Sequence, residues 1–461
     1  MADSLYDVLY RKAQVELARI LEGEERGIVR LYGTALYDIR RVLKELYDRY
    51  AVDGRLSNAD MSRYNRLLAV QDQVEGILQK RMKQVDSFTR RLTAQQYQEA
   101  FYRHAYAIDQ AGGMSLSWGL VPQEAVEAAM DSPFSKLASS KALRLSREGT
   151  VDKVRQELGL SLIRGDSYEV LANRISTVLG VSVSGRTSSY NGRGAAYRSL
   201  MVARTEGQRI QVEGHEAATA KAREMGCDIE TIWDATLDGR TRPAHAALDG
   251  RAKDDPDKGW FVPEIGWVSA PLHSGVASFD INCRCRTRDQ VKGFPPKERY
   301  VRGDGVKPYQ TYDQWMGRLA SENKTFGDPQ MEKAARGYQT YKLRHGGRNV
   351  VIDSEGKFKG YCLNLEHQSG KDKARVFKSV LGIGPDDAEY LEEQIRNGLL
   401  ESKISFIKND QWGRKYETII PIEGRNGNVA DVTVGWIFDY KDSSMYNGDN
   451  RPRLASAYIK T

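Results

Sequence analysis

Residues 345–461 contain the kinds of side chain that a metal-independent ribonuclease uses. In such an enzyme the 2′-hydroxyl of RNA attacks the neighbouring phosphate, while a general base removes its proton and a general acid protonates the leaving 5′-oxygen. Cationic side chains stabilise the charge that builds on the phosphorane. The candidates for these roles are His367, Lys373, Ser456 and Tyr458. The sequence offers no evident carboxylate cluster for two metal ions, which argues against a metal-dependent nuclease.

His367 comes just before KDKARVFKSVLG, a stretch whose apolar spacing predicts a helix ending at Gly382. Helix N-termini bind anions well, so the histidine lies where a phosphate could be held. Lys373 lies on a different face of this helix from the other cations. The other three cations share one helical face, at positions i, i+4 and i+7; they are Lys371, Arg375 and Lys378. A simpler alternative is that the cations form a solvated face and that the histidine is a solvated turn residue.

The last predicted strand carries the hydroxyl candidates. Because side chains alternate along a strand, we expect Leu454, Ser456 and Tyr458 on one face and Arg453 on the other. Ser456 and Tyr458 could instead only pack and hydrogen-bond within a central strand.

A second group of residues could bind zinc. His245, His273, Cys283 and Cys285 offer two imidazoles and two thiolates, which are the ligand types of a tetrahedral zinc site. A loop-rich unit with few apolar periodicities would gain stability from such a metal. The Cys-x-Cys spacing differs from the usual two to four intervening residues of zinc sites. The alternative is that these side chains are packed or hydrogen-bonded core residues.

The elements that must position the ribonuclease candidates form an α+β pattern. After a short strand, RNVVID, and a turn, two helices are expected in KDKARVFKSVLG and DDAEYLEEQIRNG. Four strands follow: KISFIKN, KYETIIPIE, VADVTVGWIFDY and RLASAYIK. The RNGN at 425–428 predicts a two-residue hairpin turn. The expected fold of this region is two helices followed by a four-stranded antiparallel sheet.

The rest of the 461-residue chain is mainly helical, so we expect a multi-domain protein. The predicted domains are a mainly α region at 1–194, a loop-rich α+β unit at 195–292, a connector at 293–344 and the α+β domain at 345–461. The net charge is +7, but residues 345–461 hold 17 basic and 17 acidic residues and are neutral. Any binding of nucleic acid there must depend on local clusters. Neither a membrane span nor a secretory signal peptide is expected.

Three segments resemble the phage Mu F-like minor head morphogenesis family. They are ARTEGQR (203–209), IWDATLDGRTRPAHAALDG (232–250) and PLHSGVASFDINCRC (271–285), and the likeness covers about residues 195–290. This chain has Arg242 where many members of the family have a cysteine. The resemblance implies a low-copy protein near the portal inside the capsid, which can travel into the host with the genome.

The C-terminal region resembles the barnase–EndoU–colicin–RelE superfamily of toxin ribonucleases. The matching residues are LNLEHQSGKDKARVFKSVLGI (363–383) and RPRLASAYI (451–459). The resemblance implies that His367 is the acid/base and that Lys373 stabilises the phosphate charge. It also implies that Ser456 provides the hydroxyl of the last strand, beside the aromatic Tyr458. Two arginines are secondary candidates: Arg375 and Arg453.

Together these patterns predict a minor capsid protein of a phage that carries a metal-independent ribonuclease toxin. Its expected partners are portal and capsid proteins, nearby phage DNA, an RNA substrate and an immunity protein. It would reside in the virion and then in the bacterial cytoplasm. The ribonuclease needs no cofactor, and a structural zinc is expected only in 195–292. The alternatives are a purely structural head protein with a non-catalytic binding domain, or another effector. An ADP-ribosyltransferase would show an Arg…Ser-Thr-Ser…Glu-x-Glu series, and this series is not found.

Overall fold

The computed structural model describes residues 5–56, 61, 65–112, 116–132, 140–184, 187–190, 192–291, 298–301, 305–315, 329–345, 350–410, 412–439 and 451–460. The chain forms two compact units. The first comprises Met1–Thr231, Lys253–Phe261 and Trp267–Tyr300, and the second comprises Ile232–Ala252, Val262–Gly266 and Val301–Thr461. The four domains expected from the sequence stay a prediction. Among the described helices, none combines the length and apolar character needed to cross a membrane.

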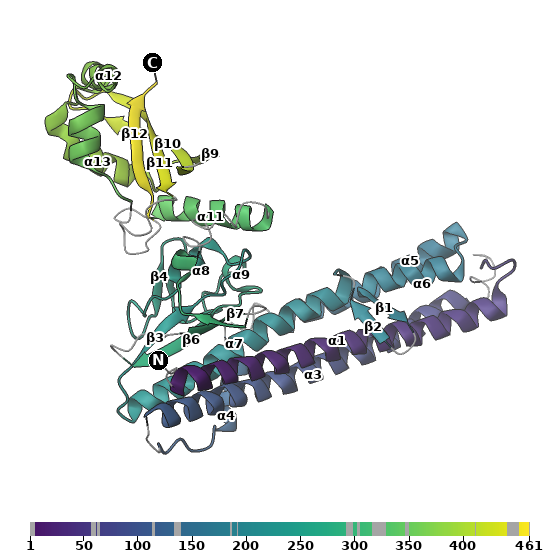
Figure 1. The fold of residues 1–461 in the computed structure, drawn as a ribbon. Coiled ribbons are helices and arrows are strands. Elements are labelled where there is room, and N and C mark those ends of the chain that lie inside the picture. The colour runs from purple at the N-terminus through teal and green to yellow at the C-terminus, as the bar shows by residue number, and fades with distance from the viewer. Residues whose placement is uncertain are drawn as a thin grey trace. The chain divides into compact units, whose positions relative to one another are not determined.

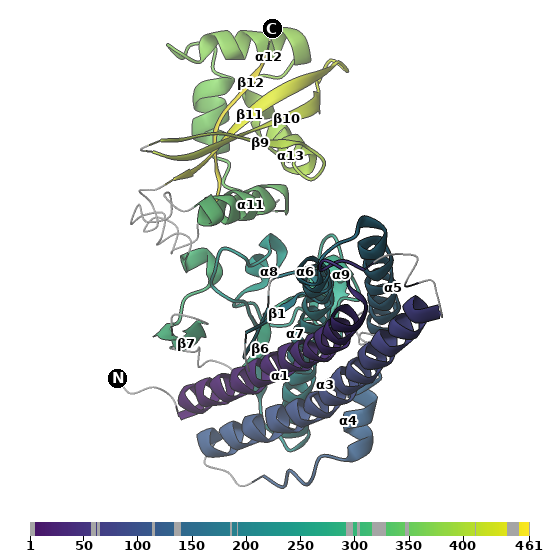
Figure 2. The same ribbon diagram turned by 90° about the vertical axis from the view of Figure 1, so that its right-hand side faces the viewer.

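The first unit is built on long helices, as the sequence predicted. Three of them, α1, α3 and α7, pack side by side (Figures 1 and 2). The first ends at Tyr50, before Asp53 and Gly54 turn the chain with positive φ angles. The bounds are α1 (Leu5–Tyr50), α3 (Arg66–Gly112), α4 (Gln123–Met130), α5 (Ser140–Arg164), α6 (Tyr168–Leu179) and α7 (Gly194–Glu224).

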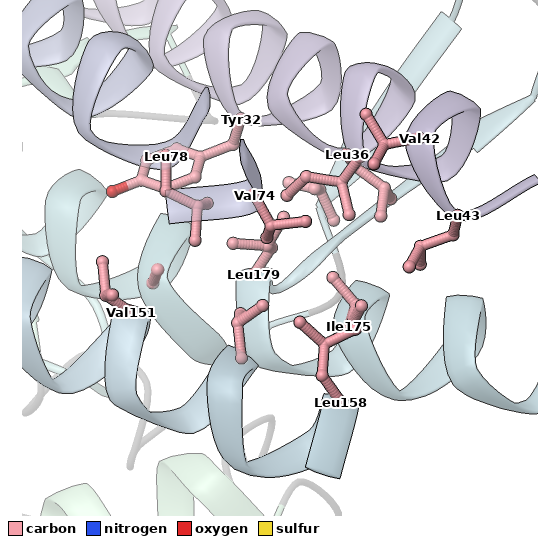
Figure 3. Packing of buried hydrophobic residues seen from close by; sticks show 14 of the residues in the cluster. Tyr32, Leu36, Val42, Leu43, Val74, Leu78, Val151, Leu158, Ile175 and Leu179 are labelled. Atoms are coloured by element: carbon pink, nitrogen blue, oxygen red, sulfur yellow. The ribbon is translucent and has the colours of Figure 1, made fainter. Parts of the chain in front are cut away.

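The apolar faces of these helices meet in one core. Leu36 of α1 and Leu158 of α5 are both buried in it, as is Ile175 of α6. Figure 3 shows these side chains pointing toward one another, together with Val74 of α3. The helical spacing of apolar residues therefore explains why this part of the chain folds as a bundle.

A buried polar contact crosses the same bundle. Glu24 of α1 accepts a hydrogen bond from Gln96 Nε2 of α3 at 2.8 Å, and Gln96 Oε1 accepts one from Gln211 of α7 at 2.7 Å. Burial raises the pKa of Glu24 to about 8. At pH 7 the folded protein therefore holds this carboxyl protonated, whereas the unfolded chain ionises it above about pH 4.5.

We therefore expect Glu24→Gln to stabilise the protein at neutral and alkaline pH. In the wild type, stability falls by about 1.4 kcal/mol per pH unit as the pH rises from the unfolded toward the folded pKa, and the cost is constant above it. Glutamine keeps the shape and has no proton to lose. In thermal and urea unfolding, the two proteins should be equally stable in acid, and the variant should be the more stable one above pH 7. Glu22→Gln, at an exposed position, is the control. A stability difference that does not change with pH would contradict the raised pKa of Glu24.

Short strands and helices complete the first part of the chain. In the glycine- and serine-rich segment at 181–194, β1 and β2 pair in antiparallel register. Gly180 ends α6 with φ 77°, and an added Cβ would lie 1.7 Å from Arg193 O, so only glycine fits. The elements are β1 (Val181–Ser184), β2 (Thr187–Tyr190), β3 (Ile229–Asp234), α8 (Pro243–Leu248), β4 (Trp260–Val262), β5 (Gly266–Val268), α9 (Ala277–Asp280), β6 (Arg286–Val291), β7 (Glu298–Val301) and β8 (Gly305–Pro308).

The C-terminal region has the two helices and four antiparallel strands that the sequence predicted. The strand order is β12-β11-β10-β9. One prediction is wrong: in the described part of RNVVID only Val351 forms a bridge, to Arg453. The elements are α11 (Pro329–His345), η3 (Ser354–Cys362), α12 (Lys371–Leu381), η4 (Pro385–Asp387), α13 (Ala388–Gly398), β9 (Ile404–Asp410), β10 (Gly413–Glu423), β11 (Val429–Asp439) and β12 (Arg453–Ile459).

Helices α12 and α13 cover one face of the sheet (Figure 1). Phe377 of α12 and Ile395 of α13 are buried with Trp436 of β11 in a single core. The α11 helix joins this region, since Tyr416 of β10 donates a hydrogen bond to Gln339 at 2.8 Å. The β10–β11 hairpin loop has five residues, Gly424–Asn428, and not the two that the RNGN pattern predicted. The sheet and its helices hold the site described next.

Candidate active site

A tight turn before α12 holds His367. Its Nδ1 accepts hydrogen bonds from the backbone N–H groups of Gly370, at 3.0 Å, and Ser369, at 3.2 Å. A neutral ring therefore carries its proton on Nε2. At Gly370 an added Cβ would lie 2.2 Å from Tyr361 O, so glycine lets α12 begin close against η3. The turn thus presents His367 as a donor through Nε2.

Tyr361 connects the histidine to Lys373. The tyrosine and imidazole rings lie 5.0 Å apart in an edge arrangement. Lys373 Nζ donates to the Tyr361 hydroxyl at 3.2 Å and lies 5.5 Å from the centre of the Tyr458 ring. One ammonium group is therefore shared between two aromatic residues beside His367. The sequence did not point to Tyr361, because the tyrosine lies in η3 and His367 in the turn that follows, so no regular helix or strand relates the two residues.

Strand β12 brings Ser456 and Tyr458 to the sheet face opposite the core. A register shift at Gly435/Trp436 places Ser456 opposite Gly435 and Tyr458 opposite Thr433. The predicted grouping of Leu454 with these two residues is wrong. The β-bulge adds one residue, so the side-chain alternation is broken and Leu454 enters the core.

Tyr458 also contacts a carboxylate, that of Glu417, which the sequence did not point to. Its hydroxyl lies 3.5 Å from Glu417 Oε2 of β10. Lys460 Nζ lies 3.5 Å from the other carboxylate oxygen. Glu417 is half-buried and pairs with Gly435 of β11. The cluster of His367, Tyr361, Lys373, Tyr458 and Glu417, called the β12-edge cluster below, thus holds a donor, a cation and a carboxylate.

The two secondary arginine candidates lie elsewhere. Arg375 is exposed and lies 3.5 Å from Asp372 on the same helix. Arg453 donates two hydrogen bonds to Asp439, at 2.9 and 3.0 Å. It is five residues from Tyr458, roughly 16 Å along the strand. Neither has a hydrogen bond or ring contact with the β12-edge cluster among the contacts of the described residues.

All four zinc candidates are buried side chains. His245 lies in α8 of the second unit, with its ring 5.7 Å from that of Trp233. Cys283 and Cys285 lie in the first unit, where Cys285 N donates to Cys283 Sγ at 3.4 Å. His273 contacts Pro271 O at 2.8 Å through Nδ1 and Glu213 Oε1 at 2.9 Å through Nε2. Both its nitrogens therefore already have partners, and zinc binding by this set stays a prediction.

Two families match parts of the chain. Residues 152–288 match Phage Mu protein F like protein, which confirms the predicted resemblance and extends it toward the N-terminus. Residues 342–461 match a domain of unknown function, DUF6883. That second match supports the C-terminal region as a domain and leaves its chemistry open.

Two relatives are similar over much longer stretches. Minor head protein GP7 of Bacillus phage SPP1 is 27% identical over 304 residues, 65% of this chain and 94% of that protein. NAD(+)–arginine ADP-ribosyltransferase EFV of Enterococcus faecalis (strain ATCC 700802 / V583) is 27% identical over 431 residues, 91% of this chain and 81% of that protein. No solved structure matches this chain.

Proposed function

We propose that this chain is a phage minor head protein whose C-terminal domain is a metal-independent endoribonuclease. The head role is supported by the Mu F-like match and by the minor head protein of phage SPP1. The ribonuclease role depends on one observation, the β12-edge cluster. It places an imidazole donor, an ammonium group and a carboxylate around two tyrosine rings. Portal and capsid proteins would be its partners in the virion, and RNA and an immunity protein would follow in the bacterial cytoplasm.

The cluster divides the chemistry between its members. Glu417 accepts the proton of the attacking 2′-hydroxyl. Lys373 neutralises the charge that builds on the phosphorane, and His367 donates from Nε2 on the side of the leaving oxygen. Ser456 lies two residues from Tyr458 on the same strand face, and adds a hydroxyl to the site. The tyrosine rings offer flat surfaces on which an unpaired base can stack.

The test uses the purified full chain and end-labelled RNA in the presence of EDTA. Wild type should yield discrete fragments that end in a cyclic phosphate. Lys373→Ala should lose at least about tenfold in rate, because a preorganised cation acts mainly on the transition state. Lys378→Ala, an exposed cation on the same helix, should cleave like wild type. Cleavage that EDTA abolishes, or intact RNA with the wild-type protein, would overturn the proposal.

A second candidate function follows from the Enterococcus relative, whose name states NAD(+)–arginine ADP-ribosyltransferase. If the C-terminal domain shared that chemistry, the full chain should release nicotinamide from NAD⁺ and label an arginine-containing acceptor. Residues 345–461 contain neither Ser-Thr-Ser nor Glu-x-Glu, which favours the ribonuclease. Incubating one protein preparation with RNA and with labelled NAD⁺ separates the two functions.

A further inference from the structure

Two histidines and an aspartate form a buried cluster in the first unit that has no part in the proposed ribonuclease. His104 of α3 and His215 of α7 both point their Nε2 atoms at Asp289 Oδ2 of β6, at 2.7 and 3.2 Å. The ligand atoms of the three residues lie within 4.8 Å of one another. All three side chains are buried. Residues from three elements, far apart in the sequence, thus converge on one point.

The surroundings orient this cluster in the way that outer-shell groups orient metal ligands. Thr231 donates to Asp289 Oδ1 at 2.9 Å, and Thr219 donates to Oδ2. Thr287 Oγ1 lies 3.4 Å from His215 Nδ1.

A small cavity adjoins the two imidazoles. Its volume is about 20 Å³, enough for roughly one water molecule. Beside His104 and His215, it is lined by Gln14 and Gln211. Among the described residues, the Oε1 atoms of these two glutamines are buried and have no hydrogen-bond partner. The cavity therefore offers acceptors for both protons of a water molecule next to the cluster.

We propose that His104, His215 and Asp289 bind one divalent transition-metal ion such as Zn²⁺, with a water in this cavity as the fourth ligand. A tetrahedral ion with bonds of about 2.0–2.2 Å spaces its ligand atoms about 3.3 Å apart. The His215–Asp289 spacing of 3.2 Å already fits, and His104 needs to move by about half an ångström. The ion would fasten α3 and α7 to β6, so its role is structural. The competing interpretation is a buried carboxylate that only accepts hydrogen bonds.

The test measures metal content and cobalt spectra of the full chain. We expect the protein to take up Co²⁺ with visible d–d absorption and without thiolate charge-transfer bands, because the ligands are nitrogen and oxygen. Thiolate bands would instead report on Cys283 and Cys285, so the two candidate sites are distinguished in one spectrum. Zn²⁺ should raise the melting temperature after chelation. A wild-type chain that takes up no Co²⁺, or only thiolate-bound Co²⁺, overturns the proposal.

Variants provide a second measurement. His215→Gln and Asp289→Asn should weaken Zn²⁺ binding by more than about 10–100-fold, the loss that removing an outer-shell partner already causes. Thr93→Val changes another buried polar side chain of α3 and should keep the nitrogen–oxygen cobalt signal. Equal metal content in folded His215→Gln and wild-type protein would also overturn the proposal. If a variant does not fold, the wild-type spectrum still decides.

Discussion

Replacement of His367 by alanine should lower the rate of RNA cleavage by about 10²–10⁴-fold, the range of a residue that moves a proton or donates to the developing charge. The fold should not change. His367 lies in a half-buried turn outside the apolar core, and its ring contacts only backbone N–H groups and Tyr361 among the described contacts. Single-turnover cleavage of end-labelled RNA measures the rate, and thermal unfolding checks the fold.

The design separates two roles for the ring. Glutamine offers an N–H donor but cannot transfer a proton at neutral pH, so His367→Gln should recover part of the rate if donation from Nε2 suffices. It should match alanine if a proton must move. Gln368→Ala, at the exposed neighbouring position, is the control. Unchanged cleavage by His367→Ala would remove the histidine from the site. The cleavage rate of Ser456→Ala tests the serine hydroxyl separately, and a lower rate would show that the hydroxyl contributes.

The C-terminal fold could be predicted because its information is local. The α12 helix shows apolar residues at helical spacing and ends at Gly382, whose φ of 67° suits glycine. Most of β10 alternates between more and less buried residues, and β11 is mostly apolar and mostly buried. Where the geometry depends on a partner strand, prediction failed. The bulge at Gly435/Trp436 is invisible in RLASAYI, so the face of Leu454 was assigned wrongly.

For the candidate sites, even less could be predicted from the local sequence. His367 and Lys373 lie six residues apart and could be grouped from the sequence, whereas Glu417 enters through strand pairing across the sheet. His104 and Asp289 are 185 residues apart, and each lies in a helix or strand that contains other polar residues as well. No period marks such a residue as a ligand. Only the packing of α3 and α7 against β6 places these side chains together.

Phe377→Ala should destabilise the C-terminal region by about 3–5 kcal/mol, the usual cost of removing a buried aromatic ring and leaving a cavity. Phe377 is fully buried in the core between α12 and the sheet. Phe377→Leu keeps most of the volume and should cost about 1–1.5 kcal/mol. Urea unfolding followed by tryptophan fluorescence measures both, since Trp436 lies in the same core. A loss below about 1 kcal/mol for alanine would mean that the core is not packed as described.

This variant also separates stability from catalysis. Phe377 lies one helical turn after Lys373 on α12 and fastens that helix to the sheet. Tyr361 of the β12-edge cluster packs against the same core, but the Phe377 ring has no group that could move a proton or hold charge. Well below its melting temperature, Phe377→Ala should therefore keep the wild-type rate per folded molecule. His367→Ala should do the reverse, losing the rate and keeping the melting temperature. If both variants lost activity only in proportion to unfolded protein, the cluster would be part of the scaffold and the C-terminal domain would be a binding module.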